Sequence, residues 1–231
     1  MIVMAKKLKT AAELLTELNI NPDYKRFIKD KEQERYKTEE QLRNEEFDII
    51  AQLKNVGLNV SSVWDLVNAK YSYPNAINIL INNLQIEYDN KIKEGIIRAL
   101  SVKEAIGLAN PALIEEYNRI PKEEMLLRWT IGNTIYTTIT EDSVDSILPI
   151  VQDKTNGMSR QMFVLALGKL KSEKAENVLI CLLDDDEVIH QALEALGKMK
   201  SKGAKDKIAM LTNHPKAAIR KRAKNVLKKV L

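Results

Sequence analysis

The chain has 231 residues, of which 45% are apolar, 29% charged and 5% aromatic, and its formal net charge is +4. This composition excludes a disordered chain, and the low content of Gly (eight) and Pro (six) favours helices over a β-sandwich. No apolar run approaches the about 20 residues that span a bilayer, so we expect no membrane partner. The single cysteine, Cys181, cannot form an internal disulfide, which predicts a cytoplasmic location, and its apolar neighbours predict a small core residue.

Residues 1–58 form the first predicted region, a helical N-terminal cap. A short helix is expected from Ala5 to Asn19, ending before Pro22, and a second helical stretch from Asp23 to Asn55. The region contains equal numbers of basic and acidic residues and no internal repeat. Two interpretations remain open: a solvated helix that caps the next region, or a protruding helix that contacts a partner.

Residues 59–231 form the second predicted region, in which a ten-residue pattern recurs. An aliphatic residue is followed by a residue that is usually basic, two free positions, two small or apolar positions, a free position, two more apolar or small positions, and often Gly. The five copies are Ile92–Ser101, Leu127–Tyr136, Ser159–Gly168, Val188–Gly197 and Ile219–Lys228. Their starts are 35, 32, 29 and 31 residues apart, a near-constant period that indicates a repeat architecture.

Positions 1, 5, 6, 8 and 9 of the pattern share one broad face of a helix. A second amphipathic segment lies between successive copies, and acidic or turn-forming residues such as Asp184–Glu187 follow each pair, where they suit a helix N-terminus. The second segments are Pro111–Tyr117, Val144–Val151, Ala175–Leu183 and Ala204–Leu211. A more diverged pair is expected over Val60–Leu84. Each repeat is therefore predicted to be helix, turn, helix, turn, with a core made by stacking neighbours.

The block Val188–Gly197, with the acidic turn before it and Ala204 and Leu211 after it, resembles the short HEAT repeats of the type named after phycobilisome lyases. Copy two departs from the pattern with Trp129 and Tyr136, and copy four has Ile189 in place of the basic residue. The resemblance implies an all-α fold: a right-handed α-α superhelix, or HEAT-type solenoid, of about five helix pairs plus a terminal basic helix. It also implies that the second helices line a concave, protein-binding surface.

Polar residues at exposed positions of the second segments are the first candidate site, which we call the ridge. Its expected members are Asn78, Asn82, Gln85, Glu115, Asn118, Asp145, Gln152, Asn177 and Asp184. Residues 59–197 carry a net charge of −7, so the ridge favours a basic or polar protein partner. The alternative is that these side chains are merely solvated.

Basic residues of the last helix are the second candidate site, the basic patch. Its members are Lys216, Arg220, Lys221, Arg222, Lys224, Lys228 and Lys229. Residues 198–231 carry a net charge of +11, which suits the polar outer face of a terminal repeat, an acidic protein partner or nucleic acid. Base stacking has no support there, because no aromatic residue lies between Phe163 and Leu231.

No catalytic, metal-binding or cofactor-binding constellation is predicted. His190 and His214 lie 24 residues apart, and Gly-rich phosphate loops and nucleophile motifs do not occur. The acidic run Asp184–Glu187 lacks the features of a calcium loop and is interpreted as a turn between repeats.

The preferred function is a non-enzymatic scaffold or adaptor that binds another protein, with an immunity or inhibitor protein as a specific version. The alternative is nucleic-acid binding through the last helix, including a DNA glycosylase like those built from HEAT-like repeats. Trp64, Asp65 and Trp129 would be its candidate residues, although the acidic middle of the chain disfavours DNA. A lyase or chaperone for a bilin chromophore is suggested only by the name of the repeat type.

Overall fold

The computed structural model describes residues 9–170 and 172–230, and these residues form helices and no strand. None of the described helices is both long enough and apolar enough to cross a membrane. The chain divides into two compact units, the first ending at Glu45 and the second beginning at Glu46. The predicted all-helical fold is therefore confirmed.

The first unit contains α1 (Ala11–Ile20) and α2 (Pro22–Glu45). Thr10 starts α1 with a capping box, in which its hydroxyl accepts from Glu13 N and the Glu13 carboxylate accepts from Thr10 N at 2.8 Å. Residues 5–8 of the expected helix lie outside the described residues. Neither α1 nor α2 contains a buried residue, so this unit has no core of its own among its described residues.

The second unit begins with α3 (Phe47–Asn55), whose Ile49, Ile50 and Leu53 are buried. The boundary between the two compact units therefore lies before residue 58, because these three side chains pack with the helices that follow. The repeat pattern itself starts only after α3. The later helices are α4 (Trp64–Val67), α5 (Ile77–Asn83), α6 (Asn90–Ala99), α7 (Asn110–Arg119), α8 (Met125–Thr138), α9 (Val144–Gln152), α10 (Gln161–Leu167), α11 (Glu173–Cys181), α12 (Ile189–Met199), α13 (Lys205–Leu211) and α14 (Ala217–Val230).

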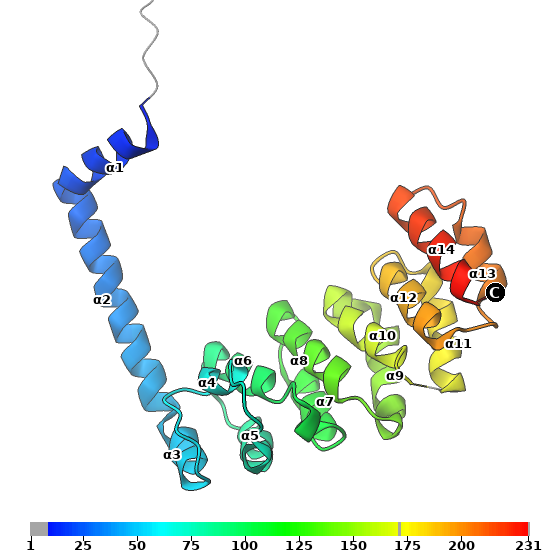
Figure 1. Cartoon of the computed structure of the whole chain (residues 1–231), viewed down its shortest axis with the longest axis horizontal. Helices are drawn as coiled ribbons and strands as arrows, with labels where there is room; N and C mark the ends of the chain where they lie inside the picture. The colour runs from blue at the N-terminus through cyan, green and yellow to red at the C-terminus, as the bar shows by residue number, and fades with distance from the viewer. Residues whose placement is uncertain (1–8, 171, 231) are drawn as a thin grey trace, which may run out of the picture. The chain divides into compact units, whose positions relative to one another are not determined.

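The five pattern copies coincide with α6, α8, α10, α12 and α14, which we call the motif helices. Each motif helix packs against the next one in the chain, and α4 packs against α6 (Figure 1). The alternating helices α5, α7, α9, α11 and α13 are the second helices of the pairs, and α9 packs on α11. The helix, turn, helix, turn prediction is confirmed.

The core follows the predicted positions of the pattern. At position 5, for example, Ile96, Ile131 and Phe163 have no exposed surface. Position 6 departs in the last copy, where the lysine at this position, Lys224, is exposed. The repeated apolar face therefore forms one continuous core between the two sets of helices.

Two glycines allow motif helices to approach closely. A Cβ placed on Gly132 of α8 would lie 3.0 Å from Met162 Cβ of α10. A Cβ on Gly168, directly after α10, would lie 2.4 Å from Ala195 Cα of α12, closer than two such atoms can come. Glycine at these positions therefore sets the separation of α8, α10 and α12.

Candidate partner-binding surfaces

The nine ridge residues all lie at the surface. Asn78 and Asn82 belong to α5, and the others belong to α7, α9 and α11 or directly follow a second helix. Every one of the nine is exposed. The sequence therefore identified the solvent face of the second helices, while the role of this face in binding stays a prediction.

Two of the ridge carboxylates are held in ion pairs that link successive repeats. Lys174 Nζ of α11 lies 2.8 Å from Asp145 Oδ1 of α9, and Lys207 Nζ of α13 lies 2.6 Å from Asp184 Oδ2. Each acidic side chain therefore faces a lysine of the following second helix. These pairs match Asp145 and Asp184 locally, whereas Glu115, the third ridge carboxylate, accepts a hydrogen bond from the uncharged side chain of Gln85.

The residues of the basic patch have different roles. Lys216 Nζ pairs with Asp186 Oδ2 at 3.0 Å, and Arg220 donates from Nη1 to the carbonyl oxygens of His214 and Pro215 at 2.8 and 2.7 Å. These two side chains fasten the turn before α14 and the start of the helix. The remaining members, Lys221, Arg222, Lys224, Lys228 and Lys229, are exposed.

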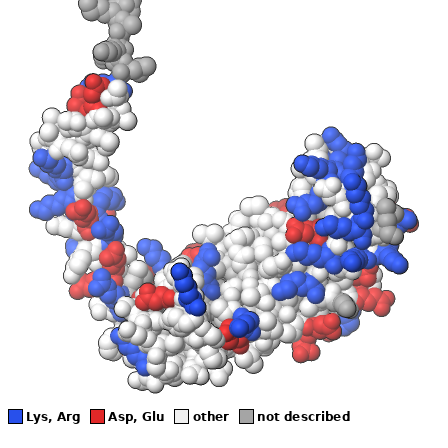
Figure 2. Space-filling model, viewed as in Figure 1, with Lys and Arg blue, Asp and Glu red and all other residues white. Residues whose placement is uncertain are grey.

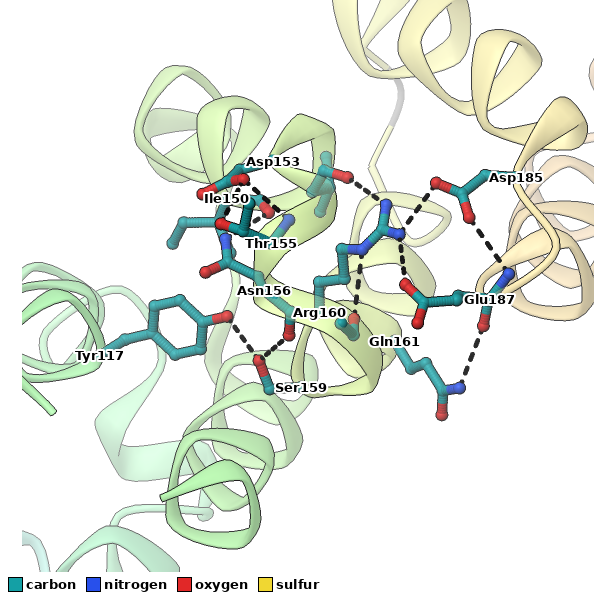
Figure 3. A network of polar contacts seen from close by, with 12 residues as sticks. Tyr117, Ile150, Asp153, Thr155, Asn156, Ser159, Arg160, Gln161, Asp185 and Glu187 are labelled. Atoms are coloured by element: carbon teal, nitrogen blue, oxygen red, sulfur yellow. Dashed lines mark hydrogen bonds and ion pairs between the residues drawn. The ribbon is translucent and has the colours of Figure 1, made fainter. Parts of the chain in front are cut away.

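The basic residue at position 2 of the pattern is a structural link, shown best by Arg160 (Figure 3). Its side chain is fully buried, and its Nη2 lies 2.8 Å from Asp185 Oδ2 and 3.0 Å from Glu187 Oε2. Nη1 donates to Val151 O at 3.0 Å, and Nε donates to Gly157 O at 3.1 Å. Arg160 thus joins the end of α9 to the acidic turn before α12.

In two other copies the cation at this position likewise bonds carbonyl groups near the end of a second helix and a side chain of the following repeat. Lys93 Nζ donates to the carbonyl oxygens of Leu84 and Ile86 at 2.6 Å and pairs with Glu116 at 3.0 Å. Arg128 donates to Ile120 O at 2.9 Å and to Asn156 Oδ1 at 2.6 Å, with its guanidinium 4.0 Å from the centre of the Tyr117 ring. These cations satisfy carbonyl groups at the C-terminal ends of second helices or just beyond them, where helices leave carbonyls unpaired.

The acidic turn is structural, as its sequence interpretation predicted. Asp184 and Asp186 pair with Lys207 and Lys216, and Asp185 and Glu187 pair with Arg160. Among the described residues, no group of three or more His, Cys, Asp and Glu could hold a metal ion. All four carboxylates of this turn are therefore accounted for by neighbouring cations.

A basic and aromatic cluster, absent from the sequence-based predictions, lies on the motif helices. The Nζ atoms of Lys169 and Lys198 each lie 5.0 Å from the centre of the Tyr136 ring. Lys198 Nζ donates to the Tyr136 hydroxyl at 2.7 Å, a bond that raises the pKa of Lys198, and Lys169 Nζ donates to Tyr136 O at 2.6 Å. Packing of α8, α10 and α12 thus gathers residues up to 62 positions apart.

Further charged side chains connect this cluster to α14. Glu194 Oε1 lies 3.4 Å from Lys198 Nζ, and Glu194 Oε2 lies 2.9 Å from Arg222 Nη1. A small cavity of about 210 Å³ lies here, lined in part by Glu194, Lys198, Arg222 and Lys229. Lys169, Lys198 and Lys229 each occupy position 11 of their copy, one residue beyond the ten-residue pattern. This shared position is the signal that could have added Lys169 and Lys198 to the predicted basic residues.

Two of the glycosylase candidates have structural partners. Trp64 Nε1 donates to Lys91 O at 3.0 Å, and the Asp65 carboxylate accepts from Ser61 N at 2.8 Å and Ser62 N at 3.1 Å. Trp129 lies on α8 and is partly exposed. Trp64 and Asp65 therefore stabilise α4 and its contact with α6.

The prediction that Cys181 is a core residue is wrong, because its side chain is exposed at the end of α11. Its neighbours Val178 and Ile180 are only partly buried, whereas Leu179 and Leu182 are buried. A continuous apolar run does not reveal which of its residues faces solvent.

A family model described as HEAT repeats matches residues 144–228, the segment that runs from the start of α9 into α14. A search of curated proteins finds no match.

Proposed function

We propose, from the HEAT repeats that this chain carries, that the protein is a non-enzymatic scaffold that binds another protein. Proteins with such repeats are commonly interaction scaffolds, because stacked helix pairs create extended binding surfaces. In this proposal the helix pairs of residues 59–231 form a right-handed superhelix, and the repeats are of the phycobilisome-lyase type.

The observation that carries the proposal is the division of charged residues into two sets. Cations at position 2, such as Lys93 and Arg160, are buried and bonded within the fold. Cations at position 11, such as Lys169 and Lys198, are exposed beside Tyr136. Aromatic residues are enriched at protein interfaces, so the surface around Tyr136 is a candidate binding surface.

The ridge is the second surface in this proposal. An immunity or inhibitor protein that covers a basic partner would use it, and the exposure of all nine side chains supports access. The ion pairs of Asp145 and Asp184 count against a strongly basic partner, because these carboxylates are already matched by lysines. We therefore propose the basic side of the motif helices as the main binding surface.

Nucleic-acid binding is the second candidate function, favoured by the Tyr136 ring between two lysines. Lysines neutralise phosphates, and an aromatic ring stacks with a base. This reading predicts a steep fall of affinity with salt, because each neutralised phosphate releases counterions.

The test is an affinity purification of the full chain from native lysate, divided into nuclease-treated and untreated halves. A stoichiometric protein that survives nuclease treatment supports the scaffold. A ridge variant combining Asn82→Ala, Glu115→Ala and Asp145→Ala, and a variant combining Lys169→Glu and Lys198→Glu, show which surface holds it. Recovery of nucleic acid alone, lost at moderate salt, would replace the scaffold by the second candidate function.

A further inference from the structure

The solvent-facing side of the motif helices α8, α10, α12 and α14 combines apolar and basic side chains. We call it the motif face. Trp129 and Tyr136 lie seven positions apart on α8 and so share one side of that helix, with Leu126 one turn before Trp129. Figure 2 shows Lys and Arg gathered over the C-terminal helices, beside an uncharged stretch over the middle of the second unit. The motif face thus changes from apolar to basic along the chain.

The apolar part lies on α8 and α10. The side chain of Leu126 is 70% exposed and that of Met125 46% exposed, while Trp129, Met162 and Leu165 are partly exposed. Close packing at Gly132 brings Met162 of α10 against α8. Adjacent exposed apolar side chains of this size favour an interaction site, because folded monomers seldom leave such groups together in water.

The basic part has a regular spacing. Lys169, Lys198 and Lys229 lie at the same position of three successive copies, on helices that pack side by side. Neighbouring packed helices are about 8–10 Å apart, so these ammonium groups recur at about that distance. Carboxylates seven residues apart on a partner helix recur at a similar distance of about 10.5 Å, from the rise of about 1.5 Å per residue.

We propose that the motif face binds an acidic amphipathic helix of a partner protein, which deepens the scaffold function and rests on it. The apolar side of that helix contacts Leu126, Trp129 and Leu165. Its carboxylates pair with Lys169, Lys198 and Lys229. Buried apolar area supplies affinity, and the row of cations fixes orientation and excludes basic competitors.

Two observations favour a protein helix over nucleic acid. Both lysines already lie against the Tyr136 ring, which leaves less of the ring for base stacking. Leu126 and Met125 contribute apolar surface that a phosphate backbone does not use.

The probe is a fluorescent synthetic helix of about 21 residues, with Leu at i, i+3, i+4 and i+7 and Glu on the flanking positions. A scrambled peptide of equal composition and an oligo(dT) strand serve as comparisons. Fluorescence anisotropy measures their binding to the full chain. The motif-face variant combines Lys169→Glu and Lys198→Glu. The matched control combines Lys205→Glu and Lys224→Glu, which changes the net charge equally at exposed positions of α13 and at position 6 of α14.

The proposal expects the amphipathic peptide to bind more tightly than the scrambled peptide. The motif-face variant should lose about tenfold in affinity, and the control variant less than about threefold. Leu126→Ser, at an exposed position that leaves the fold intact, should also weaken binding about threefold or more. Circular dichroism confirms that each variant is folded.

Equal binding of both peptides, equal losses in both charge variants, or tighter binding of oligo(dT) than of the peptide would each overturn the proposal. The scaffold function is judged separately by the lysate experiment. If a nuclease-resistant partner is recovered equally well with the motif-face variant, the scaffold stands and the acidic helix on this face does not.

Discussion

Replacing Arg160 by Met should cost far more stability than any exposed ion pair of the chain. The change removes the charge that faces Asp185, a residue only 7% exposed, and it leaves Val151 O and Gly157 O without this donor. Glu187 loses less, because its side chain is 48% exposed and can turn to water. Breaking a buried pair by removing one partner costs about 3–5 kcal/mol, so we expect a loss in that range.

The loss should appear in urea unfolding followed by circular dichroism and by tryptophan fluorescence. Trp64 and Trp129 both precede Arg160 in the chain, and Arg160 joins α9 to the turn before α12. Because repeats are stabilised mainly by their neighbours, the C-terminal repeats of Arg160→Met should unfold at lower urea than the tryptophan-containing part. The helical signal should therefore fall before the fluorescence changes.

Two further variants test the reasoning. Lys174→Met removes the partner of Asp145 from a pair whose side chains are 68% and 73% exposed, and it should cost no more than about 1 kcal/mol. Adding Asp185→Leu to Arg160→Met removes the unpaired buried charge and should recover part of the loss. A loss below about 1 kcal/mol for Arg160→Met, or no recovery in the double variant, would refute the assignment of Arg160 as a buried link.

Three other outcomes are expected. Gly168→Ala forces a Cβ against Ala195 and should lower the free energy of unfolding in urea by about 1–3 kcal/mol. Gly203→Ala, whose Cβ would meet only ordinary contacts, should lower it little, and equal losses would contradict the close approach of the helices at Gly168. Burial raises the pKa of Glu46, so the charged carboxylate lowers the stability of the folded protein at neutral pH. Glu46→Gln should therefore raise the melting temperature at pH 7, and this gain should vanish as the pH falls towards about 4.3, the pKa of an unperturbed Glu. Cys181 should react with a thiol reagent in the folded protein, and protection until unfolding would show that it is not exposed.

The helices and the core could be predicted because the period of the pattern fixes which residues face inward. Position 5 shows this most directly, since Ile96 and Ala192 have no exposed surface. The ridge was also predictable as a solvent-facing side, because residues four positions apart on a helix share a face. Such arguments need only one helix at a time.

Features that depend on two or more helices could not be predicted in the same way. The cluster of Tyr136, Lys169 and Lys198 needs the relative rotation of α8, α10 and α12, which close contacts at Gly132 and Gly168 help to set. The ion pairs that offset ridge charge likewise join separate second helices. Net charge along a sequence therefore does not show which carboxylates of the ridge lie beside a lysine.

The two positions that carry cations in the repeats explain why exposed lysines recur along the motif face in the C-terminal repeats. A cation at position 2, such as Arg160, has no exposed surface and pairs with the acidic turn, so it adds nothing to the surface charge. A cation at position 11 lies at the end of a motif helix, where the helix dipole stabilises it, and Lys169, Lys198 and Lys229 are all exposed there. Copies one and two have Val102 and Thr137 at this position, and copies three to five have lysine. Replacing Thr137 by Lys should therefore extend the basic row by one repeat and strengthen binding of the acidic helix probe, whereas unchanged binding would show that spacing along the motif face does not govern recognition.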